Sequence, residues 1–159
     1  MRTWGDIPLR SASAVPAERL AALHALCFEE AWDASSISGL LAMPGAFGFV
    51  AGPDEAPAGL VLARLGGGEA EILTIGVAPA ARGTGIGRTL LEAAAAAVAA
   101  AGGESLFLEV AEDNPVAIRL YEQFGFYLVG IRPAYYARGA SRVAARTLRC
   151  DIPAVRGLS

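Results

Sequence analysis

A glycine-rich run in the middle of the sequence, Arg82–Arg88, has the composition of a loop that binds an anion. Its three glycines let successive backbone N–H groups turn toward a ligand, and the alanine-rich stretch that follows predicts a helix with a partly positive N-terminus. Such a loop suits phosphate or pyrophosphate. It is not a Walker loop, because Arg82 and Arg88 replace the first glycine and the lysine, and its GxGxG spacing is not a dinucleotide fingerprint. A plain tight turn is an equally good interpretation.

Two side chains that can exchange protons follow this loop, Glu109 and Tyr121. Glu109 is the one charge in the apolar run 105–111, which predicts a buried strand, and an unpaired carboxylate among apolar groups is a stronger base than one in water. It is a candidate general base, unless it lies at the strand end and reaches water or an arginine. Asn114 predicts a helix cap, and Tyr121 near the end of that helix is either a proton donor or a core residue.

The single histidine favours a structural role. His24 lies on a predicted helix whose buried stripe is expected to be Leu20, Leu23 and Leu26. No acid or cysteine is placed in the sequence to complete a triad or a metal site with it. We therefore expect no metal.

The composition describes one globular domain over residues 1–159. The chain is 54% hydrophobic and 18% charged, which is sufficient to form a core. Its net charge is −3 and its arginines are scattered, so nucleic acid is not an expected partner, although a local acidic pocket for a cationic substrate is compatible with it. Cys27 and Cys150 lack CxxC spacing and are expected to be small buried hydrophobes.

The sequence predicts neither a membrane span nor secretion. The longest apolar run, Ala93–Ala101, is far shorter than the ~20 residues that cross a bilayer. Residues 1–8 contain an acid and a proline where a signal peptide needs apolar side chains. The expected location is cytoplasmic.

Turn residues and hydrophobic periodicity predict an α+β (mixed α/β) fold, with a mixed sheet of six or seven strands and about four helices packed on both faces. One βαβ crossover is expected, so the strands before and after the long helix should be parallel. The glycine-rich loop and Glu109 then lie at carboxyl ends of parallel strands, where open sheets bind ligands. The expected strands are 7–10, 47–52, 58–65, 69–77, 105–110, 126–132 and 143–152, with a loop joining the last two.

These residues together resemble the GNAT acyltransferase family, and closely its RimI-type protein N-terminal alanine acetyltransferases. The family pattern is a (Q/R)xxGx(G/A) loop followed by N-x-x-A-x-x-L-Y-x-x-x-G-F, which Arg82–Gly87 and Asn114–Phe126 match. The resemblance implies the GNAT fold and an acetyl-coenzyme A-dependent N-acetyltransferase. The other matching stretches are Glu71–Pro79, Thr89–Leu91, Leu106–Val110 and Tyr135–Tyr136.

The resemblance also implies roles for individual residues. Loop amides would hold the pyrophosphate of acetyl-coenzyme A, and a splayed strand would pair with the pantetheine arm, with the N–H of Val77 facing the thioester oxygen. Glu109 would be the general base and Tyr121 the general acid. The implied cofactor-binding residues are Ile75, Gly76, Val77, Arg82, Gly83, Thr84, Gly85, Ile86, Gly87, Arg88 and Asn114.

The implied acceptor is the α-amine of a protein N-terminus, with a small-subunit ribosomal protein as the family's expected partner. Two stretches bordering the acceptor site depart from the family pattern, because Glu29–Trp32 lacks a Pro-Trp pair and Ser141–Arg146 lacks an acidic residue. A GNAT enzyme for small amines and a non-catalytic acyl-coenzyme A-binding module remain alternatives. The implied substrate-binding residues are Glu30, Trp32, Tyr135 and Tyr136, although a solvated helix end beside a core tryptophan would explain the first two equally well.

Overall fold

The computed structural model describes residues 7–153. Residues 1–6, which contribute to the expectation of a cytoplasmic location, lie outside this range. None of the helices in the described range is long and apolar enough to cross a membrane.

Seven strands form one mixed sheet in the order β1-β2-β3-β4-β5-β7-β6, which confirms the predicted architecture. β4 and β5 are the parallel pair, as the single crossover predicted, and the other neighbouring strands are antiparallel. The strands are β1 (Leu9–Ser11), β2 (Ala46–Ala51), β3 (Gly59–Gly66), β4 (Glu69–Val77), β5 (Ser105–Ala111), β6 (Tyr127–Arg138) and β7 (Ser141–Asp151).

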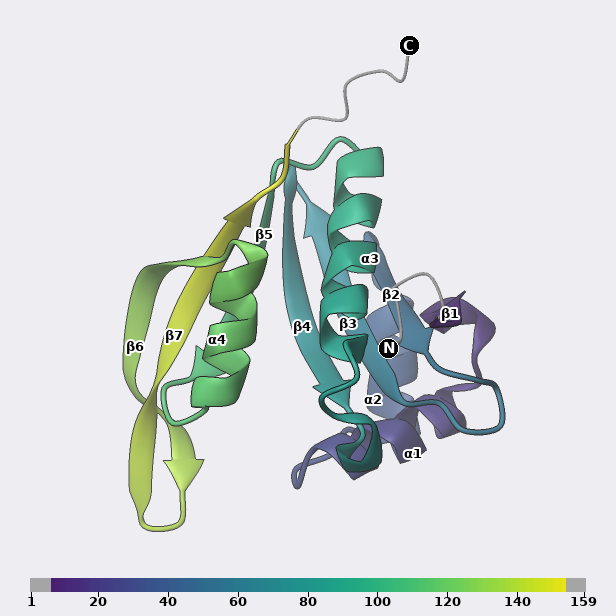
Figure 1. Ribbon diagram of the computed structural model, residues 1–159, viewed down its shortest axis with the longest axis horizontal. Helices are drawn as coiled ribbons and strands as arrows, with labels where there is room; N and C mark the ends of the chain where they lie inside the picture. Colours follow the sequence, from purple (N-terminus) through teal and green to yellow (C-terminus); the bar gives the residue numbers. More distant parts are fainter. Residues whose placement is uncertain (1–6, 154–159) are drawn as a thin grey trace.

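The helices cover both faces of the sheet (Figure 1). One apolar core lies between the sheet and the pair α3 (Ile86–Ala100) and α4 (Pro115–Phe124), and a second lies between the sheet and the pair α1 (Ala17–Cys27) and α2 (Ala34–Leu41). Two short 3-10 turns, η2 (Ala12–Ala14) and η3 (Pro79–Ala81), complete the elements. Because the side chains of each strand alternate between the two faces of the sheet, consecutive residues in the middle strands pack into different cores.

The parallel pair β4–β5 stays together for only three residues. Glu69–Glu71 pair with Ser105–Phe107, and beyond them β4 is bonded to β3 and β5 to β7. A register shift opposite Leu62 and Ala63 leaves Leu73 as an extra residue in β4, just past the last β4–β5 pair. Such bulges increase the local twist. The two strands therefore diverge toward their carboxyl ends, and the region between the diverging strands is called the wedge below (Figure 1).

Two details of the prediction are wrong. β6 continues to Arg138 instead of ending at 132, because it is an edge strand and tolerates the missing N–H of Pro133, while a register shift next to Ala134 (φ +53°) absorbs the proline. Leu26 is 60% exposed. A helix turns by about 100° per residue, so each step of three residues falls about 60° short of a full turn. Leu26, two such steps after Leu20, therefore points away from the buried face, whereas His24, four residues after Leu20, points in nearly the same direction as Leu20.

The close packing of α1 on β4 gives the first testable prediction. A Cβ at Gly76 would lie 2.8 Å from Phe28 Cε2 and 2.9 Å from Cys27 Cβ, whereas a Cβ at Gly66 would meet nothing within 4 Å. We expect Gly76→Ala to lower the free energy of unfolding by about 1–3 kcal/mol. Gly66→Ala should change it by less than ~0.5 kcal/mol. Urea unfolding measures both, and equal midpoints for the two variants would contradict the packing.

Candidate active site

The glycine-rich loop lies at the N-terminus of α3 with its backbone open. Gly85 caps the helix at φ +90° without a side-chain bond, so the first N–H groups of α3 have no partner within the helix. Gly83 has φ +78°, and a Cβ there would meet nothing within 4 Å. Two side-chain hydrogen bonds stabilise the loop: Arg82 Nε donates to the Val77 carbonyl at 3.1 Å, and the Thr84 hydroxyl donates to the Ala81 carbonyl. Its geometry fits a phosphate group.

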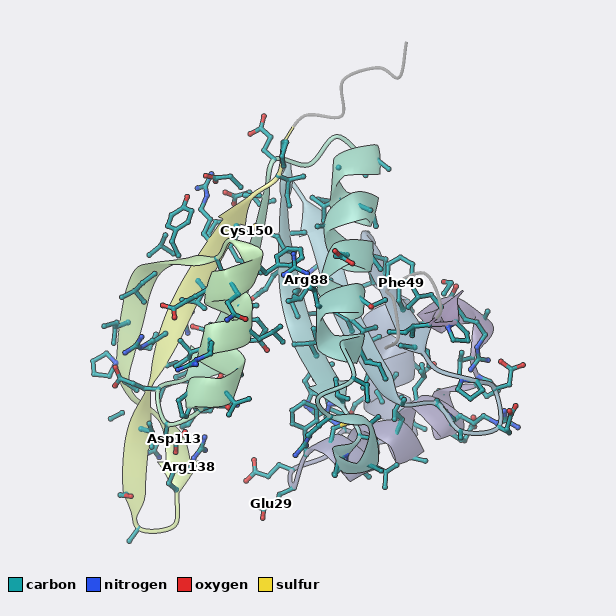
Figure 2. All side chains as sticks on the ribbon, viewed as in Figure 1. Glu29, Phe49, Arg88, Asp113, Arg138 and Cys150 are labelled. Carbon is teal, nitrogen blue, oxygen red and sulfur yellow. The ribbon has the colours of Figure 1, made fainter. Side chains whose placement is uncertain are left out.

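The last part of the loop belongs to helix packing. A Cβ at Gly87 would lie 3.0 Å from Leu120 Cδ2, so this glycine lets α3 approach α4. Arg88 lies on the side of α3 that faces α4 (Figure 2), with its guanidinium 5.4 Å from the ring centre of Phe124 and 3.7 Å from Glu92. Ile86 is 3% exposed and belongs to the core beneath α3.

The strand that precedes the loop presents an unpaired edge to the wedge. Ile75, Gly76 and Val77 pair with β3 on one side, while on the other side β5 has already diverged. The side chains of Ile75 and Val77 pack against the core beneath α3 and α4. Apart from the Val77 carbonyl, which accepts from Arg82, the backbone groups of this stretch that point away from β3 have no strand partner among the described residues.

Glu109 is an ion-paired carboxylate, which agrees with the alternative that it reaches an arginine and not with the expectation of an unpaired charge. Leu108 and Val110 enter the core beneath α3 and α4, which puts Glu109 on the other face of the sheet. Its side chain is 19% exposed and its Oε2 lies 2.8 Å from Arg132 Nε. Thr147 also donates to this oxygen, at 3.3 Å. The sequence did not say which arginine this would be, because only the pairing of β5, β7 and β6 brings Arg132 to Glu109.

A groove of ≈ 700 Å³ begins at Glu109 and runs along this face of the sheet. Glu69 and Glu71 line it further along, and Phe107 lies between the charged groups. The alternation of acidic and apolar residues at the start of β4 was the sequence signal for these two acids. The groove is also lined by Pro44, Gly45, Arg64, Leu65, Arg132 and Thr147, and by none of the four predicted acceptor residues.

Tyr121 is buried on α4, and its surroundings keep it protonated. Its ring contacts that of Phe126 edge to face at 5.9 Å, and 7% of the residue is exposed. Burial, with a smaller contribution from Tyr136, raises the pKa of Tyr121 to about 12. Asn114 caps the same helix, as predicted, with its side-chain oxygen accepting from the Ala117 N–H at 3.3 Å.

Tyr136 connects the predicted catalytic residues with the β6–β7 hairpin. Burial raises the pKa of Tyr136, and the charge of Glu109 acts in the same direction. Its neighbour Tyr135 lies beneath the guanidinium of Arg132, 5.3 Å from the ring centre. Tyr136 therefore interacts electrostatically with both Glu109 and Tyr121.

The α1–α2 segment, residues 28–33, lies across the wedge from the hairpin. Figure 2 shows Glu29 on the α1 side, with Asp113 and Arg138 together on the hairpin side, where they form an ion pair of 2.8 Å. The hydrogen bonds to Asp113 raise the pKa of Arg138, and the charge of Glu30 adds to this effect. Trp32 packs against the core beneath α1 and α2 instead of lining the groove.

Comparisons with known proteins agree with this geometry. The pattern of the acetyltransferase (GNAT) family matches residues 17–126. N-alpha-acetyltransferase RimI of Mycobacterium tuberculosis is 45% identical over 83 residues, which are 52% of this chain and 49% of that protein. Mycothiol acetyltransferase of Thermobispora bispora is 45% identical over 56 residues, 35% of this chain and 19% of that protein. The chain thus spans about a fifth to a half of the curated relatives it matches first.

The fold comparison covers nearly the whole chain. The crystal structure of the ribosomal-protein-S18-alanine N-acetyltransferase from Escherichia coli superposes with a TM-score of 0.83 at 24% identity, over 96% of this chain and 98% of that chain. This superposition shows that the chain has the fold of these acetyltransferases. The chain belongs to the acetyltransferase (GNAT) family.

Asn114 gives the second prediction, because its oxygen is used by the helix cap while its amide N–H groups are free to meet a coenzyme. Asn114→Asp keeps a capping oxygen, so it should keep the melting temperature, whereas Asn114→Ala should lose about 1 kcal/mol of stability. We expect both variants to weaken the stabilisation by acetyl-coenzyme A in a thermal-shift measurement. Unchanged stabilisation in Asn114→Asp would limit the residue to capping.

Proposed function

We propose that this chain transfers the acetyl group of acetyl-coenzyme A to the α-amine of a protein N-terminus, with a small-subunit ribosomal protein as the candidate acceptor. The observation that carries the proposal is the carboxylate of Glu109, which stands beside the wedge and opens onto a groove. The RimI of Mycobacterium tuberculosis, an N-alpha-acetyltransferase by name, supports this acceptor class.

The donor side of the proposed site uses backbone groups. The N–H groups of residues 83–88 would hold the pyrophosphate, because they stand at the positive end of α3. Ile75, Gly76 and Val77 would bind the pantetheine arm as an added strand. When bound, acetyl-coenzyme A supplies an acetyl group activated as a thioester. Arg82 supports this arrangement by bracing the Val77 carbonyl, and Asn114 would lie near the arm.

Glu109 would accept the proton of the attacking amine. Its Oε2 lies 2.8 Å from Arg132 Nε and also accepts from the Thr147 hydroxyl, so the carboxylate is held in place. An α-ammonium with a pKa of ~8 is already about a tenth neutral at pH 7, whereas a lysine with a pKa of ~10.4 is almost fully charged. One carboxylate is thus sufficient as the base for an α-amine, and this favours an N-terminus over a lysine.

The groove provides room for the residues that follow the acceptor amine. Glu69 and Glu71 give its far end negative charge, which attracts a basic peptide. The approach to Glu109 would be bordered by Glu30 and Trp32 on the α1–α2 segment and by Tyr135 and Tyr136 on the hairpin.

A small amine is the second candidate acceptor, and the mycothiol acetyltransferase relative favours it. The deciding experiment incubates the protein with radiolabelled acetyl-coenzyme A and a panel of peptides that differ in their first three residues, beside polyamines and amino sugars. Acetylated peptide α-amines support the proposal, and turnover of small amines alone contradicts it. Binding of acetyl-coenzyme A without transfer to any amine would identify an acyl-coenzyme A-binding module.

The third prediction tests Glu109 as the base. Glu109→Gln should keep the stabilisation by acetyl-coenzyme A, ~2.7 kcal/mol at a hundredfold excess over Kd, and lose about 10²- to 10⁴-fold in kcat. The loss should shrink as the pH approaches the amine pKa near ~8, because water then removes the proton. Glu112→Gln is the matched control, since Glu112 pairs with Arg146 on the surface. A ratio of variant to wild-type rates that does not change with pH speaks against the base.

The fourth prediction concerns Tyr121. A phenol with a pKa of about 12 is a weaker acid than a thiol near ~8.5, so it would stabilise the leaving sulfur by donating a hydrogen bond without losing its proton. Tyr121→Phe keeps the ring packing and should lower kcat by about 10- to 100-fold with little change in melting temperature. A thioester with a more acidic leaving thiol should reduce the loss.

Tyr127→Phe is the matched control for Tyr121→Phe, because the Tyr127 hydroxyl bonds only Asp151 among the described residues, away from the wedge. If Tyr121→Phe keeps the wild-type kcat, Tyr121 is a core residue without a part in the reaction.

A further inference from the structure

His24 makes two buried hydrogen bonds that join different elements. The residue is 2% exposed, and its Nε2 lies 3.0 Å from Thr74 Oγ1 on β4. Its Nδ1 accepts a hydrogen bond from the backbone N–H of Trp32 at 3.1 Å. Since a nitrogen that accepts carries no proton, the neutral ring holds its proton on Nε2 and donates it to the threonine. The two bonds thus connect the α1–α2 segment to β4.

We propose that His24 is a positioning residue for the acceptor: it holds the α1–α2 segment at a fixed place relative to the splayed part of β4. This inference rests on the proposed function, in which that segment borders the approach to Glu109. Thr74 directly precedes Ile75, the first of the residues expected to bind the pantetheine arm. One imidazole therefore links the acceptor side of the site with the donor side.

The contacts around the ring support this role. The ring lies 4.5 Å from that of Phe28 and 4.9 Å from that of Trp32, so residues near both ends of the segment pack on it. Gly76 allows the approach, because a Cβ there would lie 2.8 Å from the ring of Phe28. Glu30 lies between these two aromatic residues in the chain. Displacement of the segment would move Glu30 relative to the hairpin.

The position of the α1–α2 segment should depend on His24, whereas the position of β4 should not, because β4 has other hydrogen-bond partners. β4 pairs with β3 along its whole length, so its backbone does not need His24. The α1–α2 segment has no strand partner, and the Trp32 N–H bonds to His24 itself. Loss of the link should therefore release the segment and leave the donor strand in place.

The imidazole must be neutral to make both bonds, and its surroundings favour that form. Burial lowers the pKa of His24 below its ordinary value, so Nδ1 remains free to accept at neutral pH. A leucine of similar size would fill the space but leave the Trp32 N–H and the Thr74 hydroxyl without this partner. Packing alone does not require a histidine here.

The test separates the two bonds with variants of His24 and Thr74. His24→Asn offers an oxygen near the position of Nδ1 and loses the bond to Thr74, whereas His24→Gln reaches Thr74 and loses the bond to Trp32. Thr74→Val removes the hydroxyl and Thr74→Ser restores it. Leu23→Val is the control, because Leu23 is a buried residue of the same helix that belongs to the core beneath α1 and α2.

We expect His24→Gln and Thr74→Val to raise KM for the acceptor amine about tenfold or more, since a segment that is in place only part of the time binds correspondingly more weakly. kcat at saturating acceptor should change less than about twofold, and so should the affinity for acetyl-coenzyme A. Thr74→Ser should restore the wild-type KM. Hydrogen exchange should increase in residues 28–33 and stay at its wild-type rate in residues 72–77, a readout that needs no activity.

Two results would overturn the inference. In the first, His24→Gln and Thr74→Val lower the melting temperature, but their acceptor KM and their hydrogen exchange in residues 28–33 equal those of the control Leu23→Val. His24 would then be a core residue only. In the second, affinity for acetyl-coenzyme A falls together with acceptor affinity. The proposed function fails separately, if the wild-type protein acetylates a small amine and no peptide, and the same KM comparison is then made with that amine.

Discussion

The early end of the β4–β5 pairing is the constraint on which the rest of the structure depends. Three residue pairs hold the strands together, and the twist at the Leu73 bulge then separates them while β3 and β7 supply their other hydrogen bonds. A buried strand edge without a partner is costly, so an interior edge of this kind is useful only where water or a ligand satisfies it. The same divergence separates the chain that leads into α3 from the chain that leads into α4, and the loop, Glu109 and Tyr121 come from these two sides.

The electrostatics of the site follow from the two faces of β5. Leu108 and Val110 are buried in the core beneath α3 and α4, so Glu109 between them points to the other face, where Arg132 and Thr147 bond it. Tyr121 belongs to the opposite core, and burial holds its proton. A charged carboxylate and a neutral phenol are thereby kept in different environments on either side of one strand.

Strand alternation and helix-capping preferences predicted those parts of the fold that depend only on residues close together in the sequence. The bounds of β4 and the cap at Asn114 follow from alternation and capping preferences, and the structure confirms both. The single parallel crossover was also readable, because one strand–helix–strand unit has one preferred arrangement. The length of β6 was not, since a proline reads as a break unless the strand is known to be at an edge. The partner of Glu109 depends on the pairing of three strands, which no local pattern contains.

The third glycine of the loop has a consequence for the packing of the two helices that cover one face of the sheet. A Cβ at Gly87 would lie 3.0 Å from Leu120 Cδ2 across the interface of α3 and α4, so any side chain at this position would require Leu120 to shift. The GxGxG pattern therefore has two separate effects. Its first two glycines give the loop a backbone with positive φ, and the last one lets α3 pack closely against α4.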